Sequence, residues 1–328
     1  MDFSSFRGNE AAVRMLRSAA EGRRLGHAYL LCGAAGTGKK TLARIFAQAL
    51  LCGGGPKPCG RCGACVKFLK GVHPDFTVVR KPADKTAILV DQIRALREEL
   101  FIRPNEAEHR VALIEDAELM NPAAANALLK VLEEPPPYAV FLLTAKSRRA
   151  VPETIASRCI AAELFGVSKE EAAGWLRDRM PGAGEDELAE AVRYGDGNLG
   201  KSLRFLEEDS VRRGYEQAFA LAKALTARRE YDVLEALAPF DGDREGLARL
   251  LSDFDGLLGR IASAPFSPGG DPEAEALARK IPPIRAAALH DVVGEVRQAL
   301  QFNANCPLTA AFFGARLKTA LEAKTLQP

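Results

Sequence analysis

The stretch Ala28-Tyr29-Leu30-Leu31-Cys32-Gly33-Ala34-Ala35-Gly36-Thr37-Gly38-Lys39-Lys40-Thr41 decides the fold, because it joins a short apolar run to a glycine-rich loop and then to a helical pattern. Within it, Gly33-x4-Gly38-Lys39 has the spacing of a phosphate-binding P-loop. The glycines let successive backbone amides point inward, and the start of the helix adds a positive dipole. Lys39 would then reach the outer phosphates of a nucleotide. The stretch predicts a nucleotide site, with a purely structural glycine-rich turn as the alternative.

One residue of this loop departs from the P-loop pattern. The position after the lysine is normally Ser or Thr, whose hydroxyl ligates Mg²⁺, but here it is Lys40. A lysine cannot ligate a metal ion, and its charge repels one. Thr41 does not replace the missing hydroxyl, because one residue along a helix turns the side chain by roughly 100°. We therefore expect phosphate binding to be retained and magnesium-dependent hydrolysis to be impaired.

A second departure follows the apolar run Val111–Ile114, where Glu115-Asp116 takes the position of a Walker B acidic pair. Working ATPases of this type carry Asp and then Glu, the first serving Mg²⁺ and the second the attacking water. The swapped order displaces each carboxylate by about one methylene, and errors near 1 Å can cost ~100-fold in rate. A turn capped by Asp116 is the simpler alternative. The candidate nucleotide site thus comprises Gly33, Gly36, Gly38, Lys39, Lys40, Thr41, Glu115 and Asp116.

The first part of the chain, to about residue 165, alternates short apolar runs with helical patterns, which is typical of a parallel sheet covered by helices. Strands are expected at Ala28–Cys32, Phe76–Val79, Val111–Ile114, Val140–Leu143 and Cys159–Leu164. Helices are expected at Lys40–Leu51, Val90–Leu100 and Ala123–Leu132. The last helix starts at Asn121-Pro122, a capping residue followed by a proline at the first helical position. This part is predicted to be an α/β domain.

The rest of the chain, after Phe165-Gly166, carries only helical patterns. Ser168-x-x-Glu171 is a capping box that opens the first of these helices. From about residue 209, Leu and Ala recur every three or four residues, as on one face of a helix. The sequence therefore predicts three domains: an α/β P-loop domain at 1–165, a small helical domain at 166–207 and a helical C-terminal domain at 208–328.

A cluster of cysteines interrupts the α/β domain at 52–65. The spacing is Cys52-x6-Cys59-x2-Cys62-x2-Cys65, and in a reducing compartment such clustering indicates a metal rather than disulfides. Four thiolates suit tetrahedral Zn²⁺ and leave no open position for catalysis. An iron–sulfur cluster is the alternative, although its fourth cysteine usually lies further off or precedes a proline. We expect a structural zinc module.

The composition limits the classes of function. Apolar residues make up 47% and charged residues 27%, as in ordinary soluble globular proteins. The formal net charge is +2, whereas proteins that neutralise many phosphates alone usually carry a clear basic excess. No apolar run approaches the ~18 residues of a membrane span, and the first residues lack the layout of a signal peptide. We expect a cytoplasmic protein that has no membrane partner, and any contact with DNA would have to come from a local patch or from a surface shared with partners.

Two further motifs complete a family resemblance. Residues 126–136 read NALLKVLEEPP, and Ser157-Arg158-Cys159 follows one strand later. In this order and spacing, the P-loop, the cysteine insert and these two motifs resemble the clamp-loader subunits of bacterial DNA polymerase III, which have the AAA+ fold. The likeness covers the whole chain, including GVHPDF at Gly71–Phe76 and Asn305-Cys306-Pro307-Leu308. The NALLKVLEEPP and Ser157-Arg158-Cys159 motifs together are highly specific to that family.

The resemblance separates two kinds of subunit. The motor kind (gamma/tau) has an intact Gly-Lys-Thr/Ser, an Asp-Glu pair and a nucleotide-sensing arginine in its small helical domain, where this chain has Gly200. These three departures make the chain look like the delta-prime, or stator, kind. The resemblance then implies that Arg158 acts in trans as an arginine finger on the ATP of a neighbouring motor subunit. An arginine that merely caps the helix before the strand is the alternative.

The resemblance also implies the assembly. The partners of this chain would be gamma/tau motor subunits and a delta subunit, and the complex would load the sliding clamp onto primed DNA. Residues 166–207 would be a lid, and 208–328 a collar that joins the ring. Zn²⁺ would be structural, ATP or ADP would bind weakly if at all, and the chain would have no polymerase site and no ATPase activity of its own. The rivals are an active gamma/tau-type ATPase that tolerates Lys40 and a zinc-dependent nucleic-acid module.

Overall fold

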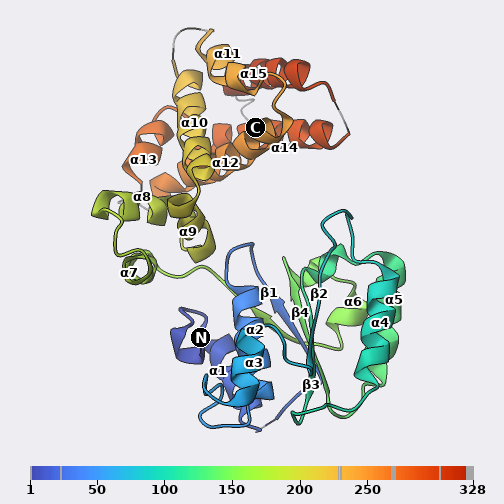
Figure 1. The fold of residues 1–328 in the computed structure, drawn as a ribbon. Coiled ribbons are helices and arrows are strands. Elements are labelled where there is room, and N and C mark those ends of the chain that lie inside the picture. Colours follow the sequence, from blue (N-terminus) through green and yellow to red (C-terminus); the bar gives the residue numbers. More distant parts are fainter. Residues whose placement is uncertain are drawn as a thin grey trace. The chain divides into compact units, whose positions relative to one another are not determined.

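The structure is a computed structural model that describes residues 2–22, 24–227, 229, 231–266, 271–302 and 304–322. The chain forms two compact units (Figure 1). The first comprises Met1–Gly184 and Gly195–Ser202, and the second comprises Glu185–Tyr194 and Leu203–Pro328. The division into three domains that the sequence suggests stays a prediction.

A parallel sheet forms the centre of the first unit. Its five strands stand in the order β2-β3-β4-β1-β5, and all neighbouring pairs are parallel. The strands are β1 Ala28–Cys32, β2 Phe76–Val79, β3 Arg110–Ile114, β4 Ala139–Ala145 and β5 Ile160–Glu163. Every residue of β1, β3 and β4 is buried, as is typical of strands that are covered on both faces. The predicted α/β class is confirmed.

Helices cover both faces of this sheet (Figure 1). The helical elements of the first unit are η1 Phe3–Ser5, α1 Glu10–Ala20, α2 Lys39–Leu51, α3 Gly63–Leu69, α4 Val90–Leu100, η2 Ala117–Leu119, α5 Pro122–Glu133, η3 Arg148–Ala150, α6 Glu153–Ala156 and α7 Lys169–Arg179. Tyr29 and Leu31 of β1 pack in one core with α1 and α2. Leu30 and Cys32 point to the opposite face and pack in a second core with α4, α5 and α6, because side chains alternate along a strand.

The start of α5 forms as the sequence predicts. The Asn121 side chain accepts a hydrogen bond from the Ala124 amide at 2.8 Å, and Pro122 occupies the first helical position. The helix ends at Glu133, shortly before Pro135, since a proline cannot continue a helix. These two signals fix both ends of α5 and make Glu133 its last residue.

The described residues of the second unit form helices and the short connections between them. Its elements, of which α8 and α9 also extend into the first unit, are α8 Glu185–Gly195, α9 Leu199–Glu207, α10 Asp209–Leu225, α11 Tyr231–Leu237, η4 Ala238–Phe240, α12 Arg244–Ser263, η5 Ala264–Phe266, α13 Pro272–Ala278, α14 Pro283–Gln301 and α15 Cys306–Glu322. Phe254 of α12 and Phe313 of α15 are fully buried and meet edge to face at 6.2 Å between ring centroids. Such packing of apolar helix faces explains the recurrence of Leu and Ala in the sequence.

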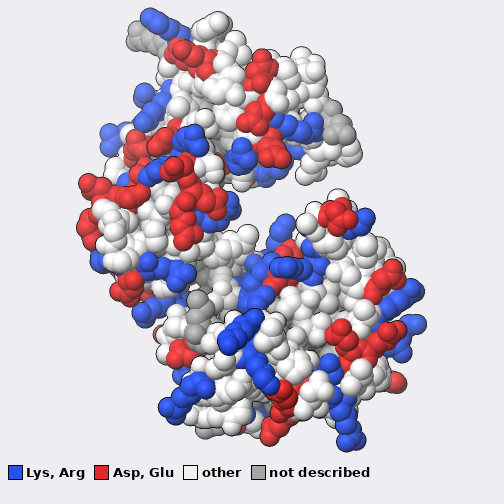
Figure 2. Space-filling view, in the orientation of Figure 1, with Lys and Arg blue, Asp and Glu red and all other residues white. Residues whose placement is uncertain are grey.

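The surface carries charges of both signs. Figure 2 shows basic and acidic side chains interspersed over the visible face of each unit, in keeping with the formal net charge of +2. Among the described helices, none combines the length and the apolar character needed to cross a bilayer.

Candidate functional site

The glycine-rich loop follows β1 at the carboxyl end of the sheet, where α/β proteins bind ligands. Gly36 and Gly38 have φ angles of 90° and 85°, and both fall in the left-handed region that favours glycine. A side chain at Gly33 would have no room, because a Cβ there would lie 2.4 Å from the Leu164 carbonyl oxygen. The loop then enters α2 at Lys39. The predicted strand, loop and helix are therefore all present.

The ammonium group of Lys39 is turned onto the loop itself. Its Nζ donates to the carbonyl oxygens of Gly33 and Ala34 at 2.7 and 2.8 Å. Lys39 is buried, and this burial lowers the pKa of its ammonium group. An ammonium has three donors, so these contacts leave one for a phosphate. A nucleotide would have to share Lys39 with the loop or draw it away.

Lys40 makes ion pairs with both acidic residues of the candidate site. Its Nζ lies 2.7 Å from Asp116 Oδ2 and 3.2 Å from Glu115 Oε2. Partial burial would lower the pKa of Lys40, but the hydrogen bond to Asp116 and the two carboxylate charges raise it. Arg44, one turn along α2, adds a contact of 3.2 Å to Glu115 Oε1. Cationic side chains thus surround the carboxylates that would otherwise attract a divalent cation.

The backbone fixes the direction of these carboxylates. Asp116 has a φ of 55°, which is uncommon for a residue with a side chain. Its amide donates to Thr144 Oγ1 at 2.9 Å, and Thr144 is fully buried near the end of β4. Thr41, by contrast, is exposed on the first turn of α2. The acidic turn is therefore held by β4, and the first turn of α2 presents Lys40 to it.

A segment distant in the sequence packs on the loop within the first unit. The Asn198 side chain donates to the Ala35 carbonyl oxygen at 2.7 Å, and the Gly200 amide donates to the Gly36 carbonyl oxygen at 3.1 Å. A Cβ at Gly200 would lie 2.7 Å from Gly36 Cα. A side chain such as arginine at this position would therefore displace one of the two segments.

Several residues of this site were not predicted from the sequence. Arg44 is four positions after Lys40, so helical spacing could have placed it on the same face. Thr144 ends an apolar run in the sequence, and its polar side chain there was only a weak indication of a contact with the acidic pair. Asn198 lies 163 positions from Ala35, and nothing local indicated this contact.

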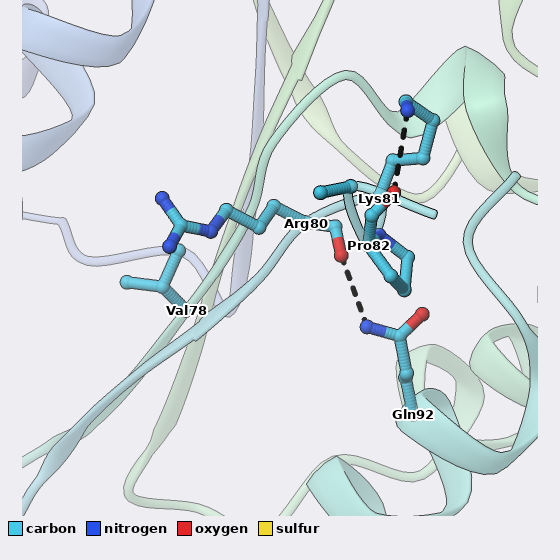
Figure 3. Close-up of a pocket in the computed structure, with 6 residues that line it drawn as sticks. Val78, Arg80, Lys81, Pro82 and Gln92 are labelled. Atoms are coloured by element: carbon cyan, nitrogen blue, oxygen red, sulfur yellow. Dashed lines mark hydrogen bonds between the residues drawn. The ribbon is translucent and has the colours of Figure 1, made fainter. Parts of the chain in front are cut away.

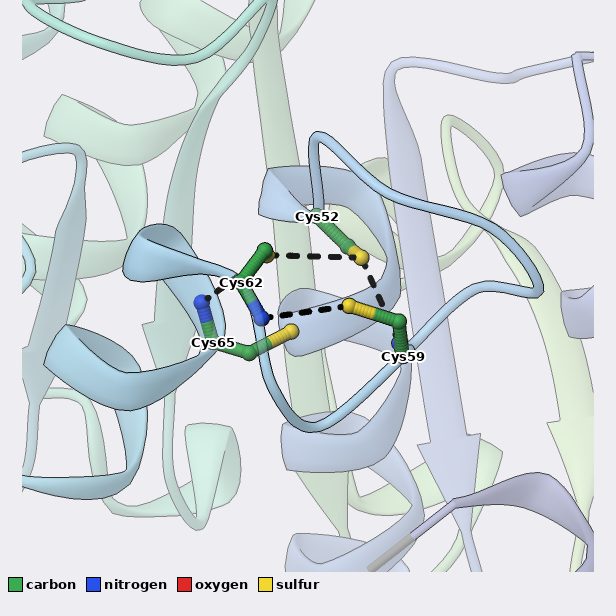
Figure 4. A group of neighbouring side chains, drawn as sticks. All are labelled: Cys52, Cys59, Cys62 and Cys65. Carbon is green, nitrogen blue, oxygen red and sulfur yellow. Dashed lines mark hydrogen bonds between the residues drawn. The ribbon is translucent and has the colours of Figure 1, made fainter.

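The four cysteines converge between α2 and α3 (Figure 4). The sulfur atoms of Cys52, Cys59, Cys62 and Cys65 all lie within 4.8 Å of one another. Hydrogen bonds from the amides of Arg61 and Cys62 lower the pKa of Cys59 to about 6. Four soft donors gathered in this way match the set that binds tetrahedral metal ions. The cluster can hold a metal ion, as the spacing suggests.

Amide groups orient the sulfur atoms. The Cys59 amide donates to Cys52 Sγ at 3.3 Å, and the amides of Cys62 and Cys65 donate to the preceding cysteine sulfur at 3.4 Å each. Such bonds orient the sulfur atoms of Cys52, Cys59 and Cys62 and favour the thiolate form that a metal requires. Cys52 and Cys65 are buried, so the cluster is anchored to the core of the first unit.

Arg158 lies at the opposite end of the sheet from the glycine-rich loop. It precedes β5, whose Ile160 pairs with Tyr29, whereas the loop follows Cys32, which pairs with Glu163. Strands rise ~3.3 Å per residue, so the length of β1 separates the two. The Arg158 guanidinium is partly exposed and contacts Glu133 at 2.7 Å and the Thr154 carbonyl oxygen at 2.8 Å. Arg158 is therefore poorly placed to serve the loop of its own chain.

A recess of about 590 Å³ lies beside the end of β2 (Figure 3). Its lining includes Arg80, Lys81 and Gln92, and the Gln92 side chain donates to the Arg80 carbonyl oxygen at 3.0 Å. The Lys81 ammonium donates to the Lys85 carbonyl oxygen at 2.8 Å. The amide of Gln92 and the ammonium of Lys81 are thus used to hold the local backbone. The sequence gave no indication of this recess.

Comparison with known proteins gives the chain a family. Residues 8–167 match the family described as DNA polymerase III, delta subunit. The delta-prime subunit of Pseudomonas aeruginosa is 40% identical over 51% of this chain and 50% of its own length. That of Haemophilus influenzae is 33% identical over 66% of this chain and 65% of its own. The gamma subunit of Buchnera aphidicola is 31% identical over 62% and 57%.

The fold has a relative among solved structures. A DNA polymerase III gamma subunit-related protein from Thermotoga maritima superposes with a TM-score of 0.52 at 17% identity, covering 94% of this chain and 99% of that one. At this identity the likeness shows the fold alone. In sequence, the chain spans about half to two thirds of the length of the three relatives above. With its P-loop, parallel sheet and four-cysteine insert, the chain belongs to the clamp-loader subunits of DNA polymerase III, and it shares 32–40% identity with delta-prime subunits.

Proposed function

We propose that this chain is the stator of a clamp loader, a subunit that helps to load the sliding clamp onto primed DNA without hydrolysing ATP itself. Its partners would be gamma/tau motor subunits and a delta subunit in the cytoplasm, with clamp and DNA engaged through the complex. Residues 166–207 would form the lid and 208–328 the collar. The observation that carries this proposal is the pairing of the Lys40 ammonium with both Asp116 and Glu115.

That pairing argues against catalysis at this P-loop. A Mg²⁺ ion needs oxygen ligands at ~2.0–2.1 Å, yet both carboxylates already contact Lys40, and Glu115 also contacts Arg44. A metal ion arriving there would meet a positive charge at a few ångströms, in a partly buried site where repulsion is weakly screened. Nucleotide binding is therefore proposed to be weak and nearly independent of magnesium.

The isolated chain is expected to show no ATP turnover above that of its Lys39→Ala variant, which controls for contaminating ATPases. Steady-state hydrolysis measured with magnesium and DNA checks this. Turnover near that of a gamma/tau subunit, lost in Lys39→Ala, would instead identify the chain as an active motor. The same measurement thus separates the stator from its enzyme rival.

Replacing Lys40 with threonine should make nucleotide binding depend on magnesium. The substitution removes the ammonium from Asp116 and supplies the hydroxyl that a P-loop normally offers to the metal. We expect magnesium to strengthen ADP binding by about tenfold, or ~1.4 kcal/mol, in Lys40→Thr and very little in the natural chain. Titration calorimetry with and without magnesium measures this. Lys40→Met, which removes the charge but offers no hydroxyl, is the control, and a Lys40→Thr chain indifferent to magnesium would contradict the account.

A role for Arg158 in trans is the second half of the proposal. Its position at the end of the sheet remote from the glycine-rich loop supports action on another chain. A guanidinium is always charged and can donate two parallel hydrogen bonds to phosphate oxygens. We propose that Arg158 stabilises the charge that develops on the phosphates of a neighbouring motor subunit.

The cysteine cluster is proposed to bind one structural Zn²⁺ through Cys52, Cys59, Cys62 and Cys65. The convergence of four sulfurs and the amide bonds to them support this ion. Zinc in a site with four protein ligands has no open position, so it would stabilise the insert and take no part in ATP chemistry.

A further inference from the structure

The contact between Glu133 and Arg158 joins two motifs that lie 25 positions apart. Glu133 is the last residue of α5, and Arg158 follows α6. The Arg158 Nη2 group lies 2.7 Å from Glu133 Oε1, while its Nη1 group donates to the Thr154 carbonyl oxygen at 2.8 Å. The two ends of the guanidinium are thus held by different partners, one charged and one neutral.

We propose that Glu133 is a positioning residue that keeps Arg158 on its own chain until a phosphate of a partner subunit replaces the carboxylate. This inference rests on the proposed action of Arg158 in trans. Carboxylate and phosphate both present oxygen atoms that fit the fork of an arginine, so one can exchange for the other. The bond to Thr154 uses the other end of the guanidinium and can persist during the exchange.

The exposure of the pair makes such an exchange feasible. The Arg158 and Glu133 side chains are 36% and 50% exposed, and exposed ion pairs contribute little stability. A contact of this kind favours the paired position of the arginine over its free positions by about two- to fivefold. A buried pair would not release, because an unpaired buried charge is strongly unfavourable. The ion pair between Glu133 and Arg158 is therefore weak enough for a phosphate to displace the carboxylate.

Chemical modification of the isolated chain tests the hold without any partner. Phenylglyoxal reacts with free guanidinium groups, and mass spectrometry of the Arg158 peptide gives the rate at this residue. Glu133→Gln, which keeps the size of the side chain and removes its charge, should raise that rate about two- to fivefold. Glu134→Gln is the matched control, because Glu134 is exposed and makes no ion pair within the described part of the chain. Equal rates in Glu133→Gln and the natural chain overturn the proposal.

The reconstituted loader tests the release. With Glu133→Gln, the ATP concentration that gives half of the burst contributed by the site facing Arg158 should fall about two- to fivefold, while the maximal rate stays unchanged. Glu134→Gln should change neither. An unchanged ATP requirement, or a lower maximal rate, overturns the proposal, because Glu133 would then be a surface contact or would act in the bound state.

The experiments distinguish a failure of the trans role of Arg158 from a failure of the positioning role of Glu133. Loss of the Arg158 side chain in Arg158→Ala must slow hydrolysis if the arginine acts in trans. If hydrolysis stays unchanged, the proposed function of Arg158 is wrong, and with it the release step, whatever the modification rates show. If hydrolysis falls while Glu133→Gln behaves like the natural chain, the trans arginine stands and only the role of Glu133 is overturned.

Discussion

Replacing Cys62 with serine is expected to release the zinc and to disorder the insert between α2 and α3. Structural zinc in small fingers binds with an apparent ~10–16 kcal/mol, and this energy stabilises the local fold. Removing one of four ligands should cost most of it. Metal analysis should fall from one zinc per chain to almost none, and hydrogen exchange should lose protection at 52–65. The parallel sheet should remain protected, since its cores do not depend on the metal.

Cys306→Ser is the control for this experiment, because Cys306 lies in the second unit, and its sulfur contacts the Phe240 carbonyl oxygen at 3.6 Å. It should keep a full complement of zinc. Purified natural chain that contains no zinc, or iron in its place, would contradict the zinc module.

Loss of the Arg158 side chain should disable one motor site of the assembled loader. Arginines supplied in trans to other NTPases contribute ~10³–10⁵ in rate, so Arg158→Ala should slow the site that it faces by about 10³-fold. Because the other motor sites keep their own arginines, the total ATP turnover of the loader should fall by much less than the rate at this one site. The burst amplitude in a rapid-quench experiment should lose the share of the affected site, and clamp loading should fall with it.

Two further variants serve as controls for the role of Arg158 in trans. Arg148→Ala removes another partly exposed arginine of the segment between β4 and β5, one that contacts Glu153 at 3.0 Å, and should leave the burst intact. Arg158→Lys keeps the charge but not the fork, and should restore only part of the rate. A fully assembled Arg158→Ala loader with an unchanged burst would make Arg158 a structural residue.

The strands of the fold could be predicted because parallel central strands are buried on both faces. The runs around Leu30, Leu113 and Leu142 are continuously apolar, and the structure has β1, β3 and β4 there. The boundaries of α5 could also be predicted, since Asn121 and Pro122 act through local hydrogen bonding and fixed backbone angles. The spacing of the cysteines was enough to predict their convergence, because it confines four ligands to a short segment.

The chemistry of the site could be predicted only in part. The sequence placed Lys40 where it would repel a metal ion, but its pairing with Asp116 depends on how β1, β4 and β3 lie side by side. The packing of Asn198 on the loop and the hold of Glu133 on Arg158 join residues far apart in the sequence. Such contacts arise from tertiary packing and leave no periodic or local pattern.

The most direct test of the stator account compares Lys39→Ala and Arg158→Ala in loaders reconstituted with gamma/tau and delta subunits. Both chains must first assemble as the natural one does. Burst hydrolysis of ATP, stimulated by clamp and primed DNA, is then measured for each complex. The account predicts that Lys39→Ala leaves the burst unchanged, because the P-loop of this chain does not hydrolyse ATP, and that Arg158→Ala reduces it. A reduced burst in Lys39→Ala together with an unchanged burst in Arg158→Ala would contradict the account and identify the chain as a motor.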